Sequence, residues 1–194
     1  MENAGGVLTL DDFIETGALL SGHFRLSSGL HSDRYLQCAR LLMWPERAEA
    51  AGRELAGRLA EFSPQAVVSP ALGGIVIGHE VARALGVRAI FTERKDGWFL
   101  LRRGFALDAG ERVAVVEDVF TTGGSTREVC AAVEANGAEV VAVGSLVDRG
   151  LPAGAFRVPA RSLLSLSVPA WPAEECPLCA RGVPIEMPGS RPPG

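Results

Sequence analysis

The stretch Val113-Ala-Val-Val-Glu117-Asp118-Val-Phe-Thr121-Thr-Gly-Gly-Ser125-Thr126 decides the fold of this sequence. Its apolar, β-branched start predicts a buried strand over Val113–Val116, which ends in two carboxylates. A turn of hydroxyl and glycine residues then leads into a helix predicted over Ser125–Ala135. The backbone N–H groups of such a turn and the positive end of the helix dipole favour a bound anion. The stretch therefore predicts a site for a phosphate monoester.

Two common phosphate loops are excluded. The turn lacks the Gly-Lys-Ser/Thr ending of a Walker loop and the Gly-x-Gly-x-x-Gly pattern of a dinucleotide turn. Glu117 and Asp118 would repel a phosphate if they pointed at it, so we expect them to accept hydrogen bonds from sugar hydroxyls or to approach hydrated magnesium. The alternative without function is a plain strand-turn-helix with polar caps.

Further strands and helices alternate on both sides of this stretch. The predicted strands cover Ala66–Ser69, Arg88–Thr92, Glu139–Val147 and Arg161–Val168, and a helix covers Ile75–Leu85 and ends at Gly86. Continuous apolar strands that alternate with helices are typical of a parallel sheet covered on both faces. The predicted fold class is therefore α/β, with a central parallel sheet flanked by helices.

The two ends of the chain differ from this core. Residues 1–44 predict a short helix over Leu10–Thr16 and a small hairpin, which we call the hood, from the alternating runs His23–Leu26 and Arg34–Gln37. Pro45 begins a helix that reaches about Phe62. We expect one structural domain in three parts: hood (1–44), core (45–168) and an irregular, proline-rich tail (169–194).

Composition excludes several classes of protein. The 194 residues are 47% hydrophobic and 22% charged, as in globular proteins. A net charge of −4 and 6% aromatic residues argue against a nucleic-acid partner. No apolar run is long enough to cross a membrane, and the first residues lack a secretory pattern, so we expect a cytoplasmic protein.

The four cysteines do not predict a disulfide scaffold. Cys38 and Cys130 lie among apolar neighbours, which favours reduced core residues. The motif Cys176-Pro-Leu-Cys179 offers two thiolates, so a zinc site would need two ligands from elsewhere, such as a second subunit. The three histidines are not at a metal-binding spacing in the sequence. A redox pair and packed or free thiols are the other interpretations.

Residues 113–126 resemble the phosphoribosyl-diphosphate (PRPP) signature of the type I phosphoribosyltransferases. The resemblance implies that Glu117 and Asp118 hold the ribose hydroxyls and that residues 121–125 hold the 5′-phosphate. The PRPP site so implied consists of Arg94, Lys95, Glu117, Asp118, Val119, Phe120, Thr121, Thr122, Gly123, Gly124 and Ser125.

Three more segments resemble the orotate phosphoribosyltransferases, so that the similarity spans roughly residues 15 to 150. The run His23–Tyr35 is similar to their hood, and Ser69–Ile75 is similar to their pyrophosphate loop, here Ala71, Leu72, Gly73 and Gly74. The segment Val147-Asp148-Arg149 is similar to the strand end whose arginine pairs with the orotate carboxylate. The resemblance implies an orotate site of Thr121, Arg149 and Ser27; a surface ion pair between Asp148 and Arg149 is the alternative.

This sequence departs from the family pattern at three places. Many orotate enzymes carry a lysine where Ser27 and Gly73 stand here. Arg94-Lys95 fits the start of the family's mobile catalytic loop, but no histidine follows, which leaves Arg102 or Arg103 to compensate. The apolar run Trp98–Leu101 lies between two glycines and suits a lid or a partner surface, with a core strand as the alternative.

The resemblance implies transfer of the 5-phosphoribosyl group from PRPP to orotate, giving orotidine 5′-monophosphate and pyrophosphate for pyrimidine (UMP) synthesis. Lys95, Asp118 and Glu117 are the implied catalytic residues. The implied cofactor is Mg²⁺, held by PRPP and water without direct side-chain ligands, and the implied assembly is a homodimer. A purine-type phosphoribosyltransferase and a non-catalytic PRPP-sensing regulator are the alternatives.

Overall fold

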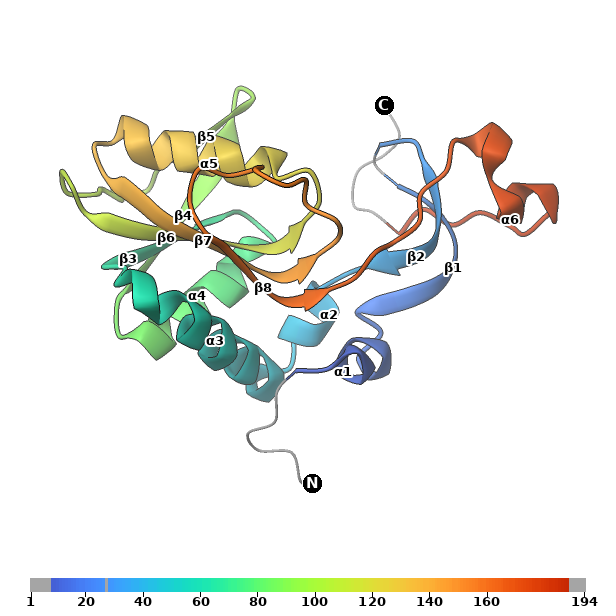
Figure 1. The fold of residues 1–194 in the computed structure, drawn as a ribbon, viewed down its shortest axis with the longest axis horizontal. Coiled ribbons are helices and arrows are strands. Elements are labelled where there is room, and N and C mark those ends of the chain that lie inside the picture. Colours follow the sequence, from blue (N-terminus) through green and yellow to red (C-terminus); the bar gives the residue numbers. More distant parts are fainter. Residues whose placement is uncertain (1–7, 27, 189–194) are drawn as a thin grey trace.

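A six-stranded sheet forms the centre of the computed structural model, which describes residues 8–26 and 28–188 (Figure 1). The strands lie in the order β5-β4-β3-β6-β7-β8. All neighbours pair in parallel except β5, an edge strand that pairs antiparallel with β4. The strands are β3 (Ala66–Pro70), β4 (Arg88–Lys95), β5 (Trp98–Leu101), β6 (Arg112–Phe120), β7 (Glu139–Asp148) and β8 (Ala160–Ser165). The predicted α/β class is confirmed, and the sheet is mixed because of β5.

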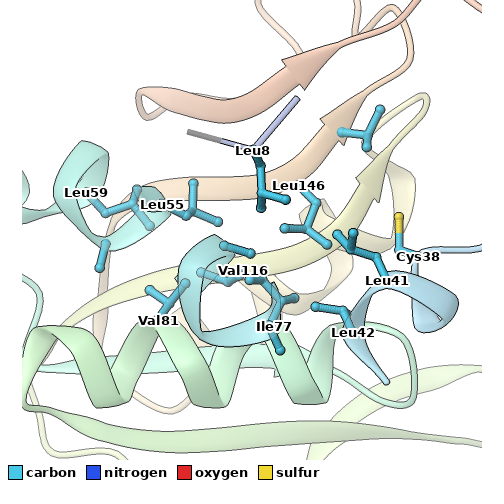
Figure 2. Packing of buried hydrophobic residues seen from close by; sticks show 14 of the residues in the cluster. Leu8, Cys38, Leu41, Leu42, Leu55, Leu59, Ile77, Val81, Val116 and Leu146 are labelled. Atoms are coloured by element: carbon cyan, nitrogen blue, oxygen red, sulfur yellow. The ribbon is translucent and has the colours of Figure 1, made fainter. Parts of the chain in front are cut away.

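Helices cover both faces of this sheet because alternate strand residues face opposite ways. Ala114 and Val116 of β6 pack in a core with α3 (Pro45–Leu59) and α4 (Gly74–Leu85), shown around Val116 in Figure 2. Val113 and Val115 face α5 (Gly124–Ala135) in a second core. These helices confirm the three that the sequence predicts, and α4 ends at Gly86 in the left-handed conformation.

The segment expected to be a lid is a β-hairpin. β4 continues through Lys95, and Asp96-Gly97 turns the chain into β5 with positive φ at both residues, 51° and 88°. Asp-Gly is a strong signal for a two-residue hairpin turn. Phe99 is buried whereas 70% of Trp98 and 43% of Leu100 is exposed. The core-strand alternative is thus confirmed for the strand and for the face that carries Phe99, which packs in the core beside α5, while the face with Trp98 and Leu100 is exposed.

The hood is an antiparallel pair, β1 (Leu19–Arg25) and β2 (His31–Leu36), as predicted. The predicted first helix is α1 (Leu10–Glu15), and a short α2 (Ala39–Leu42), which the sequence analysis missed, follows the hood. The short 3-10 segment η1 (Ala60–Phe62) extends α3.

Residues 169–188 of the tail run along the hood (red beside blue in Figure 1). Trp171 exchanges two backbone hydrogen bonds with His31, both 2.8 Å long, and Glu186 bonds to the backbone of β1. Two short elements, η2 (Ala173–Glu175) and α6 (Pro177–Ala180), lie between these contacts. Within the described part of the chain, no helix is long and apolar enough to cross a membrane.

The contact between α3 and α4 makes a stability prediction. A Cβ at Gly52 would lie 2.5 Å from Cβ of Glu80 and 2.7 Å from its backbone carbon, whereas a Cβ at Gly57 would meet nothing within 4 Å. Gly52→Ala should therefore lower the free energy of unfolding by about 1–3 kcal/mol, since the helices must separate. The same change at exposed Gly57 should raise it by up to ~1 kcal/mol through helix propensity. Urea denaturation measures both; equal effects would contradict close packing at Gly52.

Candidate active site

Glu117 lies near the carboxyl end of β6, between β3 and β7. Its carboxylate accepts a short hydrogen bond from the hydroxyl of Thr126, a fully buried residue in the first turn of α5. Burial raises the pKa of Glu117 to about 7; the Thr126 hydrogen bond opposes this rise and the nearby Asp118 charge adds to it. Glu117 is thus a carboxyl group poised between its two protonation states near neutral pH.

Asp118 follows Glu117 on β6, and burial raises its pKa as well. One of its oxygens accepts the backbone N–H of Val119 at 3.0 Å. The other lies against Gly73, where a Cβ would come within 2.7 Å of Oδ2. A side chain at residue 73 would therefore require the Asp118 carboxylate to shift. This contact brings loop 71–74 to the acidic pair.

The turn between β6 and α5 is shaped by Gly123. Its φ is +74°, and a Cβ there would lie 2.9 Å from the ring of Phe156. Thr121 and Thr122 are exposed beside it, as a ligand-binding turn requires. The side chains of Val119 and Phe120 pack in the two cores, so these residues can offer a ligand their backbone only. Gly124 and Ser125 begin α5 and contribute its N-terminal N–H groups.

Arg149 comes directly after β7 and bonds through its backbone N–H to the carbonyl of Phe120 at 2.9 Å. Asp148 does not pair with it: the Asp148 carboxylate accepts the N–H groups of Gly150 and Leu151 at 2.8 and 2.7 Å. Nε of Arg149 is buried and has no hydrogen-bond partner among the described residues. Burial also lowers the pKa of Arg149. A buried, unpaired guanidinium donor indicates a site for an anionic ligand.

Tyr35 of the hood is a candidate site residue that the sequence alone did not single out. Burial raises its pKa, while the charge of Arg149 lowers it and that of Asp118 raises it, so Tyr35 lies near both. Its ring also packs near Phe24, with 5.8 Å between centroids. Tyr35 is the single tyrosine of the chain and lies within the hood motif, and this was the signal in the sequence that could have identified it. The hood thus faces the ends of β6 and β7.

The predicted cations of the hairpin have other partners. Arg94 pairs with Glu128 of α5 at 2.8 Å and lies over the ring of Phe99 at 4.2 Å. Arg103 pairs with Glu93 at 2.8 Å, and Arg102 lies 3.9 Å from the same carboxylate.

Lys95 is exposed on the hairpin and forms no ion pair with any residue in 8–26 or 28–188. Ser27, which the resemblance places in the orotate site, lies outside the described residues. The structure thus gathers the predicted residues of β6, β7 and loop 71–74, and leaves the four cations of the hairpin without a contact to Glu117 or Asp118 in the described chain.

Residues 38–176 match the family model of the phosphoribosyl transferase domain, which spans β3 to β8 and all the strand-end residues above. The chain belongs to the phosphoribosyltransferase family.

Relatives within this family carry more specific names. An orotate phosphoribosyltransferase of Thermotoga maritima is 52% identical over 177 residues, which cover 91% of this chain and 95% of the relative. The crystal structure of orotate phosphoribosyltransferase from Aeropyrum pernix is similar with a TM-score of 0.66 and 30% identity, covering 80% of this chain and 92% of that one. The Mycobacterium tuberculosis enzyme solved with PRPP has a TM-score of 0.62 and 28% identity, covering 80% and 94%.

The raised pKa of Glu117 predicts a pH-dependent stability. The folded chain holds this proton up to about pH 7, whereas an unfolded glutamate releases it near its ordinary value of 4.5. Burial of Glu117 therefore costs nothing below pH 4.5 and progressively more stability as pH rises to about 7. Glu117→Gln should gain stability relative to the wild type by up to about 3 kcal/mol between pH 5 and pH 8.

Urea denaturation at each pH tests this, with the exposed Glu134→Gln as the control that should follow the wild type. If the free energies of unfolding of the wild type and Glu117→Gln change in parallel with pH, Glu117 is ionised over the whole range from pH 5 to pH 8.

Proposed function

We propose that this chain is an orotate phosphoribosyltransferase, which joins orotate to the 5-phosphoribosyl group of PRPP and releases pyrophosphate in pyrimidine nucleotide synthesis. The observation that carries the choice of orotate is the buried, unpaired Nε of Arg149 at the end of β7. A carboxylate is the ligand that a guanidinium fork fits best. A neutral purine would not need this cation. Relatives that are 52% identical to this chain are also named orotate phosphoribosyltransferase.

The base would lie between the hood and the strand ends. Arg149 pairs with its carboxylate, Ser27 and Thr121 provide polar contacts, and Tyr35 borders it on the hood side. A nitrogen of the orotate anion attacks the anomeric carbon of PRPP, forming the C–N bond while the C–O bond to pyrophosphate breaks and its electron pair leaves with the diphosphate. The attacking nitrogen gives up its proton as the C–N bond forms, and an oxygen of the released pyrophosphate can accept it, so no side chain has to act as a strong base.

PRPP would lie along the end of β6. Glu117 and Asp118 accept hydrogen bonds from the ribose hydroxyls, which relieves the desolvation that raises both pKa values. Residues 121–125 and the α5 N-terminus bind the 5′-phosphate. The backbone of loop 71–74, with Arg94 and Lys95, meets the pyrophosphate, where negative charge develops in the transition state.

The donors at this site suit magnesium, which prefers oxygen ligands and retains water. Asp118 lies against loop 71–74, so its carboxylate would face the hydration shell of an ion bound by the diphosphate. When bound, Mg²⁺ neutralises charge on the departing pyrophosphate. We also propose a homodimer that acts in the cytoplasm; the four cysteines, all unpaired, fit a reducing compartment.

A screen of acceptor bases tests the function. The enzyme is mixed with PRPP, magnesium and orotate, uracil, hypoxanthine, guanine or adenine, and pyrophosphate release is measured. Of these five bases, we expect only orotate to give pyrophosphate release. Turnover with a purine would establish the purine-type alternative, and PRPP binding without any turnover would establish the regulator.

The proposed role of Arg149 predicts a selective defect. Arg149→Lys keeps the charge but loses the bidentate fork. The KM for orotate should rise roughly 10- to 100-fold, as expected for loss of one charge-assisted hydrogen bond, with a much smaller change for PRPP. Steady-state kinetics measure both values, and Arg157→Lys, an exposed change in the same loop, serves as the control. Equal effects on both substrates would assign Arg149 a structural role.

Subunit mixing tests Lys95, which is exposed on a hairpin and unpaired in the described chain. If Lys95 reaches the partner's site, a dimer of one Lys95→Ala and one Asp118→Asn chain has one intact site and one with both defects. Mixing the two inactive variants should then restore up to about a quarter of the wild-type activity, since about half of the dimers are mixed and each has one good site.

The two variants are refolded together and assayed against each alone, with native mass spectrometry to count mixed dimers. Mixed dimers without recovered activity would place Lys95 in its own subunit's site or outside the chemistry.

A further inference from the structure

Folding brings four metal-binding side chains together at the hood, far along the chain from one another. His23 of β1, His31 of β2 and Cys176 and Cys179 of the tail each direct one ligand atom to a common centre, and these atoms all lie within 4.8 Å of one another. A zinc site at the cysteine pair needs two more ligands, and His23 and His31 of the same chain supply them. We propose that these four residues bind one Zn²⁺, which fastens the tail to the hood.

The distances fit one tetrahedral ion. Nε2 of His23 lies 3.1 Å from Nδ1 of His31 and 3.5 and 3.7 Å from Sγ of Cys176 and Cys179, and Nδ1 of His31 lies 3.2 Å from Sγ of Cys179. Bonds of about 2.0–2.1 Å to nitrogen and about 2.3 Å to sulfur give ligand-to-ligand distances of roughly 3.3–3.8 Å in a tetrahedron. These four distances lie within a few tenths of an ångström of the tetrahedral values, and the other two pairs lie within 4.8 Å.

The orientation of the His23 ring is set from outside the cluster. Its Nδ1 lies 2.7 Å from the carbonyl of Val183, which can only accept, so Nδ1 is the donor of this bond. In the neutral ring this leaves the lone pair on Nε2, which faces the centre as a metal ligand would. Histidine ligands of zinc commonly donate their other N–H to a carbonyl in this way. The tail thus supplies two sulfurs and the group that orients His23.

Hydrogen bonds alone do not account for this cluster. The single lone pair on Nε2 of His23 has three neighbours within 3.7 Å, namely Nδ1 of His31 and both sulfurs. One lone pair accepts one good hydrogen bond, and three of the four residues are buried from water. Two thiolates and two neutral imidazoles would balance the +2 charge of zinc, so the burial leaves no net charge.

Other occupants fit less well. Both cysteines are free thiols, so they do not form a disulfide. A Rieske iron–sulfur cluster places two cysteines and two histidines on different irons, which is incompatible with nitrogen-to-sulfur distances of 3.2–3.7 Å. Two sulfurs and two nitrogens around one centre are the ligand set of structural zinc, and complete protein coordination indicates a structural role.

The position explains why a metal would matter here. A two-stranded hairpin is marginally stable by itself. The tail contacts it mainly through backbone bonds, such as those between His31 and Trp171, and a 2.7 Å bond from Ser32 to the carbonyl of Pro169. Zinc would add a strong link between residues about 150 positions apart in the chain, at separations of 148 to 156.

Metal analysis of the untagged full-length protein tests the site. The wild type and Cys130→Ser, a cysteine of α5 outside the cluster, should each hold one zinc per chain. Cys179→Ser, the exposed ligand, should fold and bind zinc at least ~100-fold more weakly. Cobalt(II) titrated into the metal-free wild type should give the intense visible bands of tetrahedral coordination and a thiolate charge-transfer band, both clearly weaker in Cys179→Ser, which keeps one thiolate.

A chelator should lower the Tm of the wild type by roughly 5 °C or more and speed amide exchange in residues 169–188, with little change in Cys179→Ser. If the variants fail to fold, the wild-type measurements decide. A folded wild type that takes up no zinc when titrated with zinc alone, a cobalt spectrum of octahedral type, or zinc affinity unchanged in Cys179→Ser would each overturn the proposal.

Discussion

Burial of two adjacent carboxylates, Glu117 and Asp118, at the end of the central strand is the constraint around which the other elements are arranged. Desolvation makes such groups costly unless partners satisfy them. The Thr126 hydroxyl, in the first turn of α5, donates a hydrogen bond to Glu117, and the Val119 N–H donates one to Asp118. The neighbouring loop comes so near that a side chain at residue 73 would displace the Asp118 carboxylate.

These contacts explain why the local sequence pattern is so restrictive. Only Thr121, Thr122 and Gly123 separate the end of β6 from the start of α5, and this short turn of hydroxyl and glycine residues brings Thr126 close enough to bond to Glu117. Gly123 meets a second requirement, since its positive φ and the ring of Phe156 both exclude a Cβ. The motif is therefore specified by packing around the acidic pair as well as by what it would bind.

Local features were predictable from the sequence, and long-range ones were not. The strand over 113–116 and the helix after it depend on neighbours within about ten residues, so periodicity and turn chemistry suffice. The β4–β5 hairpin was missed as a regular element because Asp96-Gly97 was interpreted as part of a mobile loop. Tyr35 and the cluster at the hood depend on how the hairpin folds over the sheet and how the tail returns, and no spacing rule contains that information.

One end of strand β2 in the hood contacts the tail, and the other end lies near the candidate active site. The tail is therefore connected to the active site through β2. His31 and Tyr35 lie on the same strand, four residues or about 13 Å apart. His31 faces the tail cysteines, whereas Tyr35 lies near Arg149 and Asp118. Any constraint on the His31 end of β2 therefore limits where Tyr35 can be relative to the strand ends.

The pKa shifts of the site residues indicate why the position of the hood near the strand ends matters. The acidic pair has raised pKa values and Arg149 has a lowered one, so in each case burial penalises the charged form. Among the described residues, Arg94 and Arg103 are paired with Glu128 and Glu93 and do not neutralise the acidic pair. Ribose hydroxyls at the acidic pair and a carboxylate at Arg149, supplied by the two proposed substrates, would offset both penalties together. A hood that is already held in place before these ligands bind loses less entropy when it contacts them.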